Sequence, residues 1–84
     1  MDLDLLPALV ALADHGTLAS AGRALGLTQP AVHQRIGRLQ DAVGVPLVRR
    51  EGRRLALTEA GQELVALGRR TSGDARQVLA RVRG

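Results

Sequence analysis

The sequence predicts a mainly α-helical fold with one small β-hairpin, on three observations. Apolar residues recur at helical spacing in four stretches, which are bounded by glycines or by residues that cap helices. Only residues 26–28 separate the second helical stretch from the third. An arginine-rich segment with alternating apolar residues lies between the third stretch and the last. Elements in this order are typical of a helix-turn-helix followed by a β-hairpin, or wing.

The first two helices are expected over residues 4–15 and 18–25. We expect Asp4 to cap the first helix, which has Pro7 in its first turn, and Gly16 to end it. Its apolar residues at helical spacing are Leu6, Leu9, Val10 and Ala13. Thr17 is then placed to cap the second helix. The inner face of that helix is expected to hold Ala21, Ala24 and Leu25.

The third helix is expected over residues 29–43. Gly26 supplies the left-handed residue that ends the preceding helix, Thr28 is the expected N-cap, and Pro30 falls in the first turn. The core-facing stripe is Val32, Ile36, Leu39 and Val43. Gly37 lies on the opposite face, where a mid-helix glycine costs about 1 kcal/mol relative to alanine. Close approach of a DNA backbone or base edge would explain it, and a neutral surface glycine is the alternative.

The wing is expected as two strands, residues 47–50 and 54–57, joined across residues 51–53. Alternation along the strands predicts some apolar side chains on the helices and the arginines pointing outward. Thr58 is expected to cap the last helix, with Glu59 favourable at its positive end. That helix either runs unbroken to about Val82 or breaks near Gly73, and we favour the single helix.

Length and composition exclude several classes of protein. A chain of 84 residues fits one domain, and the absence of cysteine excludes disulfides and thiolate metal sites. There is no apolar run of about 18 residues and no signal-peptide pattern, so we expect a soluble cytoplasmic protein, which would be nucleoid-associated only if its partner is DNA. The two histidines and two serines form no nucleophilic or metal-binding set, so no enzyme, cofactor or metal is expected. The absence of aromatic residues removes the stacking platform of single-strand binders.

Positive charge is concentrated in the middle of the chain. All twelve cations are arginine, and the formal net charge is −2 over residues 1–27, +4 over 28–57 and +2 over 58–84. A GC-rich genome is an alternative reason for the absence of lysine. Arginine nevertheless suits phosphates and guanine edges, and the basic middle segment is the footprint expected of a nucleic-acid partner.

These features predict a protein that binds duplex DNA with the third helix in the major groove. Its candidate DNA contacts are Thr28, Gln29, Pro30, Ala31, His33, Gln34 and Arg38. Those of the wing are Arg50, Arg53 and Arg54, expected on phosphates or in the minor groove. The Gln29 amide fits an adenine edge, and Pro30 and Ala31 fit a thymine methyl. The alternative is a winged-helix module that binds protein, which an apolar or acidic outer face would favour.

The last helix predicts a homodimer. Its stripe of apolar and small residues is Leu64, Leu67, Gly68, Thr71, Ala75, Val78 and Val82. A stripe that runs past so small a domain has nothing in its own chain to cover it. We therefore divide the chain into a DNA-binding part, residues 1–57, and a helix for dimerisation and linkage, residues 58–84. Two such chains would present two third helices to a two-fold-related site.

Short motifs at matching spacing make the chain resemble the DNA-binding domain of LysR-type transcriptional regulators over nearly all of residues 3–70. The first helix carries Leu6, Leu9, Val10, Gly16 and Thr17. The third begins Thr28-Gln29-Pro30-Ala31-Val32 and continues with Ile36 and Leu39. The last motifs are Val43-Gly44-Val45-Pro46-Leu47-Val48-Arg49-Arg50 and Leu57-Thr58-Glu59-Ala60-Gly61. The resemblance implies a winged helix-turn-helix, bacterial-type transcription regulation on duplex DNA, and pairing of the last helix across a homodimer. The N-terminal domain of molybdate regulators is a related alternative with a weaker match.

Several positions depart from the family's pattern. His33 and Gln34 stand where Ser-Arg is common, and Gln40 stands where a glutamate is common. The usual phenylalanines are Leu9, Leu18 and Val48. The resemblance therefore implies the fold but not the preferred DNA sequence. The family normally continues into an effector-binding domain, so an effector ligand is implied only if a longer chain carries one.

Overall fold

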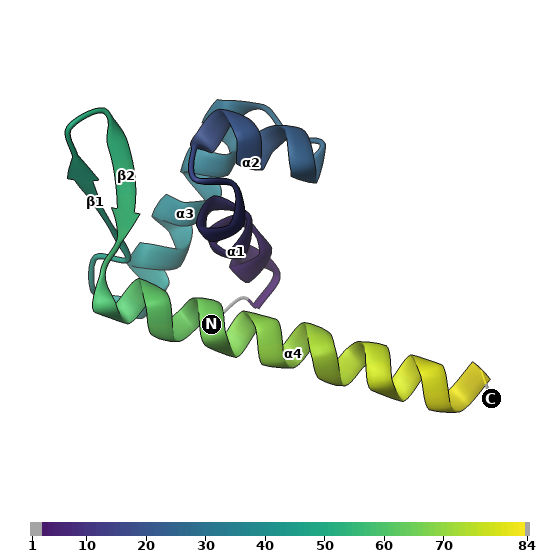
Figure 1. The fold of residues 1–84 in the computed structure, drawn as a ribbon. Helices are drawn as coiled ribbons and strands as arrows, with labels where there is room; N and C mark the ends of the chain where they lie inside the picture. Colours follow the sequence, from purple (N-terminus) through teal and green to yellow (C-terminus); the bar gives the residue numbers. More distant parts are fainter. Residues whose placement is uncertain (1–2, 84) are drawn as a thin grey trace.

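The computed structural model describes residues 3–83, with side chains described except at residues 3 and 71–78. A 3-10 helix, Leu3–Leu5, precedes α1 (Leu6–His15), α2 (Leu18–Leu25) and α3 (Gln29–Val43). The strands β1 (Val48–Glu51) and β2 (Arg54–Leu57) follow, and α4 (Glu59–Arg83) ends the chain. In Figure 1, α1, α2 and α3 gather beside the hairpin, and α4 runs along this body and beyond it. The predicted winged helix-turn-helix is thus confirmed.

The predicted cap of α2 is confirmed, whereas that of α1 is wrong. Thr17 Oγ1 accepts a hydrogen bond from the Ser20 N–H at 3.1 Å, which satisfies an orphan donor of α2. The N-cap of α1 is instead Leu5, whose side chain offers no acceptor. Asp4 lies one residue too early, within the 3-10 turn, so α1 begins at residue 6 and not at 4.

The turn between α2 and α3 is tight because two glycines permit it. Gly26 ends α2 with φ 69°, a left-handed conformation that costs glycine no Cβ clash. Gly22 is buried one turn earlier, and a Cβ there would lie 2.6 Å from the Leu27 carbonyl oxygen. Thr28 then caps α3, since its Oγ1 accepts from the Ala31 N–H at 3.2 Å. The close contact between Gly22 and the Leu27 carbonyl sets the angle between α2 and α3.

The core lies where α1, α3 and the start of α4 meet. Its largest fully buried side chains are Leu9, Leu39, Leu47 and Val32. The predicted α3 stripe is confirmed, with Val43 half-buried at its end. On α2, Ala21 is buried but Ala24 is exposed, because the buried face of this two-turn helix is centred on Ala21 and Gly22.

The wing is an antiparallel hairpin with Gly52 and Arg53 as its two-residue turn. Gly52 has φ 62°, as expected for glycine at the first central position of a type II′ turn. The register pairs Glu51 with Arg54 directly before and after the turn. Both strands are four residues long, and β1 begins at Val48 and not at the predicted residue 47.

The last helix is a single unbroken helix of 25 residues, as favoured from the sequence, and is about 37 Å long. Thr58 caps it, since its Oγ1 accepts from the Gly61 N–H at 3.1 Å. The longest dimension of the molecule, 48 Å, reflects the part of α4 that extends past the body. Within residues 3–83, no helix is both long and apolar enough to cross a membrane.

Two contacts fix the first half of α4 against α1. Gly68 is buried, and a Cβ there would lie 2.9 Å from Cγ2 of Val10, so the absence of a side chain lets the helices approach. Arg69 Nη2 donates to Asp14 Oδ1 at 2.6 Å and forms an ion pair. Both side chains are about half exposed, so the pair contributes at most about 1 kcal/mol. It serves chiefly to fix where α4 crosses α1.

Candidate nucleic-acid interface

The first two turns of α3 present short polar side chains to solvent. Gln29, Pro30, His33 and Gln34 are exposed, and Ala31 is half-buried beside them. Thr28 uses one lone pair in its capping bond, which leaves the hydroxyl proton free to donate outward. The helix dipole also gives this end of α3 a partial positive charge. The candidate contacts predicted on α3 are therefore accessible, with Ala31 the least so.

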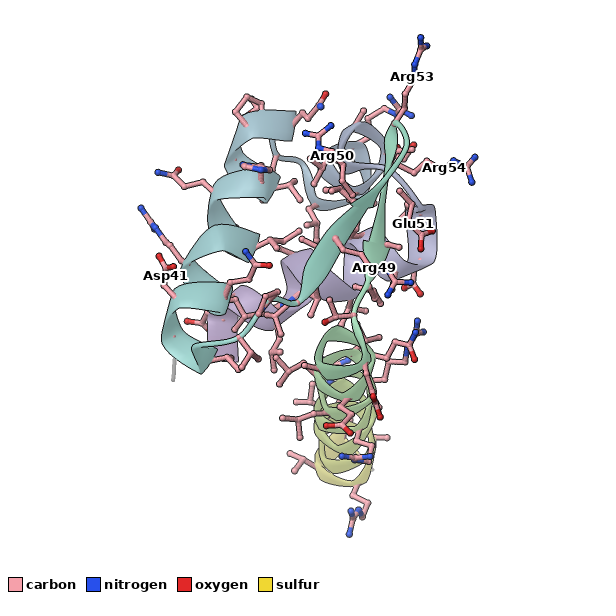
Figure 2. The ribbon with its side chains drawn as sticks, turned by 90° about the vertical axis from the view of Figure 1, so that its left-hand side faces the viewer. Asp41, Arg49, Arg50, Glu51, Arg53 and Arg54 are labelled. Carbon is pink, nitrogen blue, oxygen red and sulfur yellow. The ribbon has the colours of Figure 1, made fainter. Side chains whose placement is uncertain are left out.

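Arg38 lies farther along α3 and is also exposed. Among the side chains that the structure describes, it takes part in no ion pair, and the same holds for Arg35. Asp41 is the acidic residue of α3, and it lies at the opposite end of the helix from Gln29 (Figure 2). The outer face of α3 is thus polar with positive charge, neither apolar nor acidic.

The arginines of the wing differ in whether they form an ion pair with a described acidic side chain. Arg49 Nη2 lies 2.8 Å from Glu51 Oε1, and its Nε donates to the same oxygen at 3.2 Å. Arg50, Arg53 and Arg54 are exposed, and none of them pairs with a described acidic side chain. The three predicted wing contacts are therefore the three arginines whose charge is available to a partner.

The strand register places these arginines on different faces of the wing. Arg50 pairs with Leu55, and residues directly opposite in a hairpin share a face, so Arg50 lies on the same side as two half-buried residues, Val48 and Leu55. Figure 2 shows Arg50 extending toward the α3 side, with Arg53 at the tip and Arg54 on the other side. The prediction that alternation turns every arginine outward is thus wrong for Arg50. Its side chain is nevertheless exposed.

The predicted dimer stripe on α4 is only partly free. Leu64 and Leu67 are half-buried against the core of their own chain, and Gly68 is buried against Val10 of α1. The side chains of Thr71, Ala75 and Val78 lie outside those that the structure describes. Val82 is 78% exposed and Leu79 is 52% exposed. Leu79 is an apolar residue that the predicted dimer stripe did not include. Among the α4 side chains that the structure describes, the exposed large apolar ones therefore lie at the far end of the helix.

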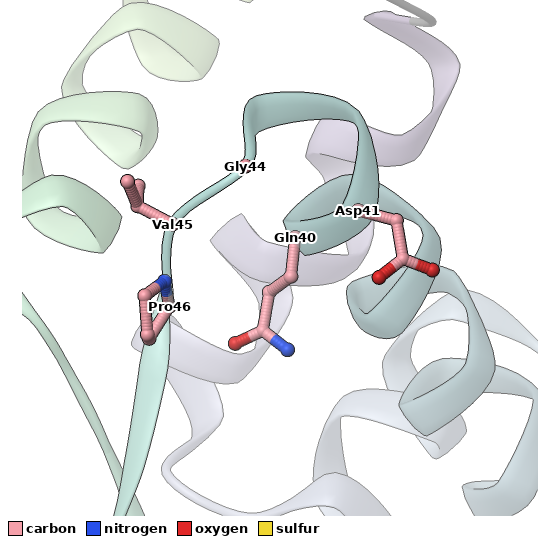
Figure 3. A pocket seen from close by; sticks show the side chains of 5 residues that line it. All are labelled: Gln40, Asp41, Gly44, Val45 and Pro46. Atoms are coloured by element: carbon pink, nitrogen blue, oxygen red, sulfur yellow. The ribbon is translucent and has the colours of Figure 1, made fainter.

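One open depression of the surface contains a single titratable side chain. An open depression of about 400 Å³ lies beside the end of α3, lined by Gln40, Asp41, Gly44, Val45 and Pro46 (Figure 3). Asp41 is the only titratable residue in its lining. No group of three potential metal ligands occurs in the part of the chain that the structure describes.

Sequence reasoning missed the role of Gln40. Its side-chain oxygen accepts hydrogen bonds from the backbone N–H groups of Leu47 and Val48, at the base of the wing. The sequence analysis noted Gln40 only where the family commonly has a glutamate, and no local pattern indicates an acceptor for a segment seven residues away.

Comparison with known proteins places this geometry in a family. The family model for bacterial regulatory helix-turn-helix proteins of the lysR family matches residues 3–62. An uncharacterized HTH-type transcriptional regulator of Azotobacter vinelandii is 48% identical over 65 residues, 77% of this chain and 45% of its own length. The HTH-type transcriptional regulator PecT of Dickeya dadantii is 43% identical over 70 residues, 83% of this chain and 22% of its own length. The chain thus spans less than half the length of these relatives.

Solved structures show the same fold. The CbnR DNA-binding domain, crystallised in complex with DNA, superposes with a TM-score of 0.86 at 30% identity, over 99% of this chain and 95% of that one. Full-length LysG from Corynebacterium glutamicum with bound effector Arg gives a TM-score of 0.91 at 32% identity, over 100% of this chain and 29% of that one. With the family model covering both the helix-turn-helix and the wing, the chain belongs to the LysR family of bacterial regulatory helix-turn-helix proteins.

Proposed function

We propose that the chain is the DNA-binding domain of a transcriptional regulator, with α3 in the major groove of duplex DNA and the wing on the backbone or in the minor groove. The observation that carries the proposal is the surface shared by α3 and the wing. It combines an exposed polar helix start with three arginines that have no described acidic partner. A single α-helix fits the major groove, and arginines beside it supply the phosphate contacts that give non-specific affinity.

The side chains of α3 fall into two groups by chemistry: those suited to contact base edges specifically and those suited to contact bases or phosphates generally. The Gln29 amide offers a donor and an acceptor, the pair that matches the N6 and N7 positions of adenine. Pro30 and Ala31 present apolar surface of the size of a thymine methyl. Thr28, His33, Gln34 and Arg38 surround them with groups that bond to bases or phosphates. Sequence preference would therefore come from the first turns of α3.

We also propose that the regulator acts as a homodimer paired through α4. The support is the exposed apolar surface at Leu79 and Val82, on the part of the helix that extends past its own domain. A dimer presents two copies of α3 to a two-fold-related site, which raises both affinity and specificity. A cytoplasmic, nucleoid-associated location would follow from this function, and an effector ligand would belong to a further domain.

The proposal is tested by changing charge at the wing and at a distant site. Arg53→Ala with Arg54→Ala removes two positive charges at the wing, and Arg81→Ala with Arg83→Ala removes two at the far end of α4 as a matched control. Binding to a labelled duplex of random sequence is titrated over a salt series. The wing variant should bind every duplex more weakly, with a salt slope lower by about 0.9 for each phosphate that the wing no longer neutralises. The control should keep its slope.

Two results would count against the proposal. An unchanged slope in the wing variant would remove the wing from the interface. If the unaltered chain shows no salt-dependent binding to duplex DNA, the protein-interaction alternative is favoured and the proposed function fails.

A further inference from the structure

We propose that Gln40 is a positioning residue that sets where the wing stands relative to α3, an inference that rests on the proposed function. Its Oε1 accepts from the N–H of Leu47 at 2.9 Å and from the N–H of Val48 at 3.2 Å. No other hydrogen bond joins α3 to the hairpin among the residues that the structure describes. One side-chain oxygen thus connects the helix that would read the bases to the wing that would hold the backbone.

The chemistry of the contact fixes the orientation of the amide. Both partners are backbone donors, so only the oxygen of the Gln40 amide satisfies them, and the nitrogen does not. Leu47 is fully buried and Val48 is half-buried, so their N–H groups are poorly served by water if the oxygen is removed. Figure 3 shows the Gln40 side chain beneath the Gly44–Pro46 turn, with its oxygen on the side of the segment that leads into β1.

The segment from Pro46 to Val48, which leads into β1, is also hydrogen-bonded to the start of α4. The carbonyl oxygen of Leu47 accepts from the Thr58 N–H at 3.0 Å, and that of Pro46 accepts from the Thr58 hydroxyl at 2.8 Å. Gly61 makes this approach possible, since a Cβ there would lie 2.1 Å from the Leu47 carbonyl oxygen. The base of the wing is therefore clamped between Gln40 and the first turn of α4.

Clamping the base has a consequence for the tip. Arg50 lies two residues beyond Val48 on the same face of β1, and the turn that carries Arg53 follows at once. A hairpin held at its base presents these arginines in one place before DNA arrives, so less conformational entropy is lost on binding. Without the oxygen, the wing keeps its charges but not its fixed position. Gln40 itself is neutral and would act without touching DNA.

The test is a double-mutant cycle on the 84-residue chain. Gln40→Met keeps the length and helix propensity but removes the strong acceptor, Gln40→Glu keeps an acceptor, and Gln62→Met is the control at an exposed glutamine without a described side-chain hydrogen bond. Each is made alone and in a chain carrying Arg50→Ala, Arg53→Ala and Arg54→Ala. Binding to the labelled random duplex is measured over a salt series, and amide hydrogen exchange of Leu47 and Val48 is followed alongside.

The proposal expects Gln40→Met to lower the affinity and the salt slope in the chain with the wing arginines and to have no further effect without them. Gln40→Glu should restore the slope and the slow exchange of both amides, and Gln62→Met should change neither. Equal reductions with and without the wing arginines, or an unchanged slope in Gln40→Met, would overturn the positioning role. In both cases the unaltered chain still binds duplex DNA, so the proposed function stands.

If Gln40→Met does not fold, Gln40→Asn takes its place in the cycle, because it keeps the amide but is one methylene too short to reach. Failure of both variants to fold, checked by circular dichroism, would assign Gln40 to stability alone and overturn the proposal.

Discussion

At the scale of single residues, the side chains at the start of α3 are small or carry only short polar groups. Thr28, Gln29 and Pro30 are therefore short enough to let the helix backbone come close to a partner surface. Each side chain has only a few atoms with which to make specific contacts. The positive charge that would hold DNA lies on longer arginine side chains, both along α3 and on the wing. In the proposed complex, different residue types would thus read the bases and contact the phosphates.

We predict that Gln29 reads one base pair. Gln29→Ala should cost about 1–3 kcal/mol at one position of the preferred site and relax the preference there, because alanine cannot form the two amide hydrogen bonds to the base. The measurement is selection of bound duplexes from a random library by the unaltered and the variant chain. Gln62→Ala, an exposed glutamine on α4, is the control. A uniform decrease in affinity over all sequences would show that Gln29 only positions the helix.

At the scale of elements, glycines decide how closely the helices and the wing approach one another. Gly22 admits the carbonyl of Leu27, Gly61 admits that of Leu47, and Gly68 admits the side chain of Val10. Gly37 differs from these three, since a Cβ there would meet nothing within 4 Å. The first three are required by packing within the chain, whereas nothing in the free domain requires the fourth.

Alanine substitutions at two of these glycines should therefore act in opposite directions. Gly61→Ala gains helix propensity, but its Cβ would overlap a backbone oxygen, so we expect a net destabilisation of about 1–3 kcal/mol. Gly37→Ala should stabilise the free chain by about 0.5–1 kcal/mol. Thermal unfolding checks both, since 1 kcal/mol shifts the midpoint by about 4–8 °C in a domain of this size.

The same pair of variants tests the outer face of α3. If a DNA backbone or base edge approaches Gly37, then Gly37→Ala should stabilise the free chain and yet weaken its binding to duplex DNA. Stabilisation without any decrease in binding would identify Gly37 as a neutral surface glycine.

At the scale of the whole molecule, one apolar stripe serves two purposes along α4. Near Val65 and Gly68 the stripe packs on α1 of its own chain, and about four turns later the same face carries Val82, with Leu79 beside it, past the end of the body. The first part fixes the direction of the helix, and the second leaves apolar surface uncovered. The direction of α4 would therefore set the spacing of two α3 helices in a dimer.

We predict a weak homodimer in the absence of DNA, because the small residues in the predicted stripe would bury little apolar area. Val78→Asp and Val82→Asp should each shift sedimentation toward the monomer over a concentration series. Ala80→Asp adds the same charge on roughly the opposite face of the helix and should leave the dimer intact. A chain that remains monomeric at high concentration, binds DNA as one copy per site and is unaffected by Val78→Asp would contradict the dimer.

Local chemistry in the sequence determined most of the helical architecture. Thr17, Gly26 and Thr28 set the ends of α2 and α3 to the residue, because caps and left-handed glycines act within a few residues of chain. The periodic stripe of α3 likewise identified its buried face. These features depend on near neighbours in the sequence, which is why they were predicted correctly.

Tertiary structure decided what depends on contacts across the chain. It placed Gln40 on the base of the wing, turned Arg50 toward the α3 side and buried Gly68 against Val10. Each of these outcomes follows from the register of a strand or the crossing of two helices, which local periodicity does not encode. The type of each element could thus be derived from the sequence, whereas the arrangement of the interface required the folded chain.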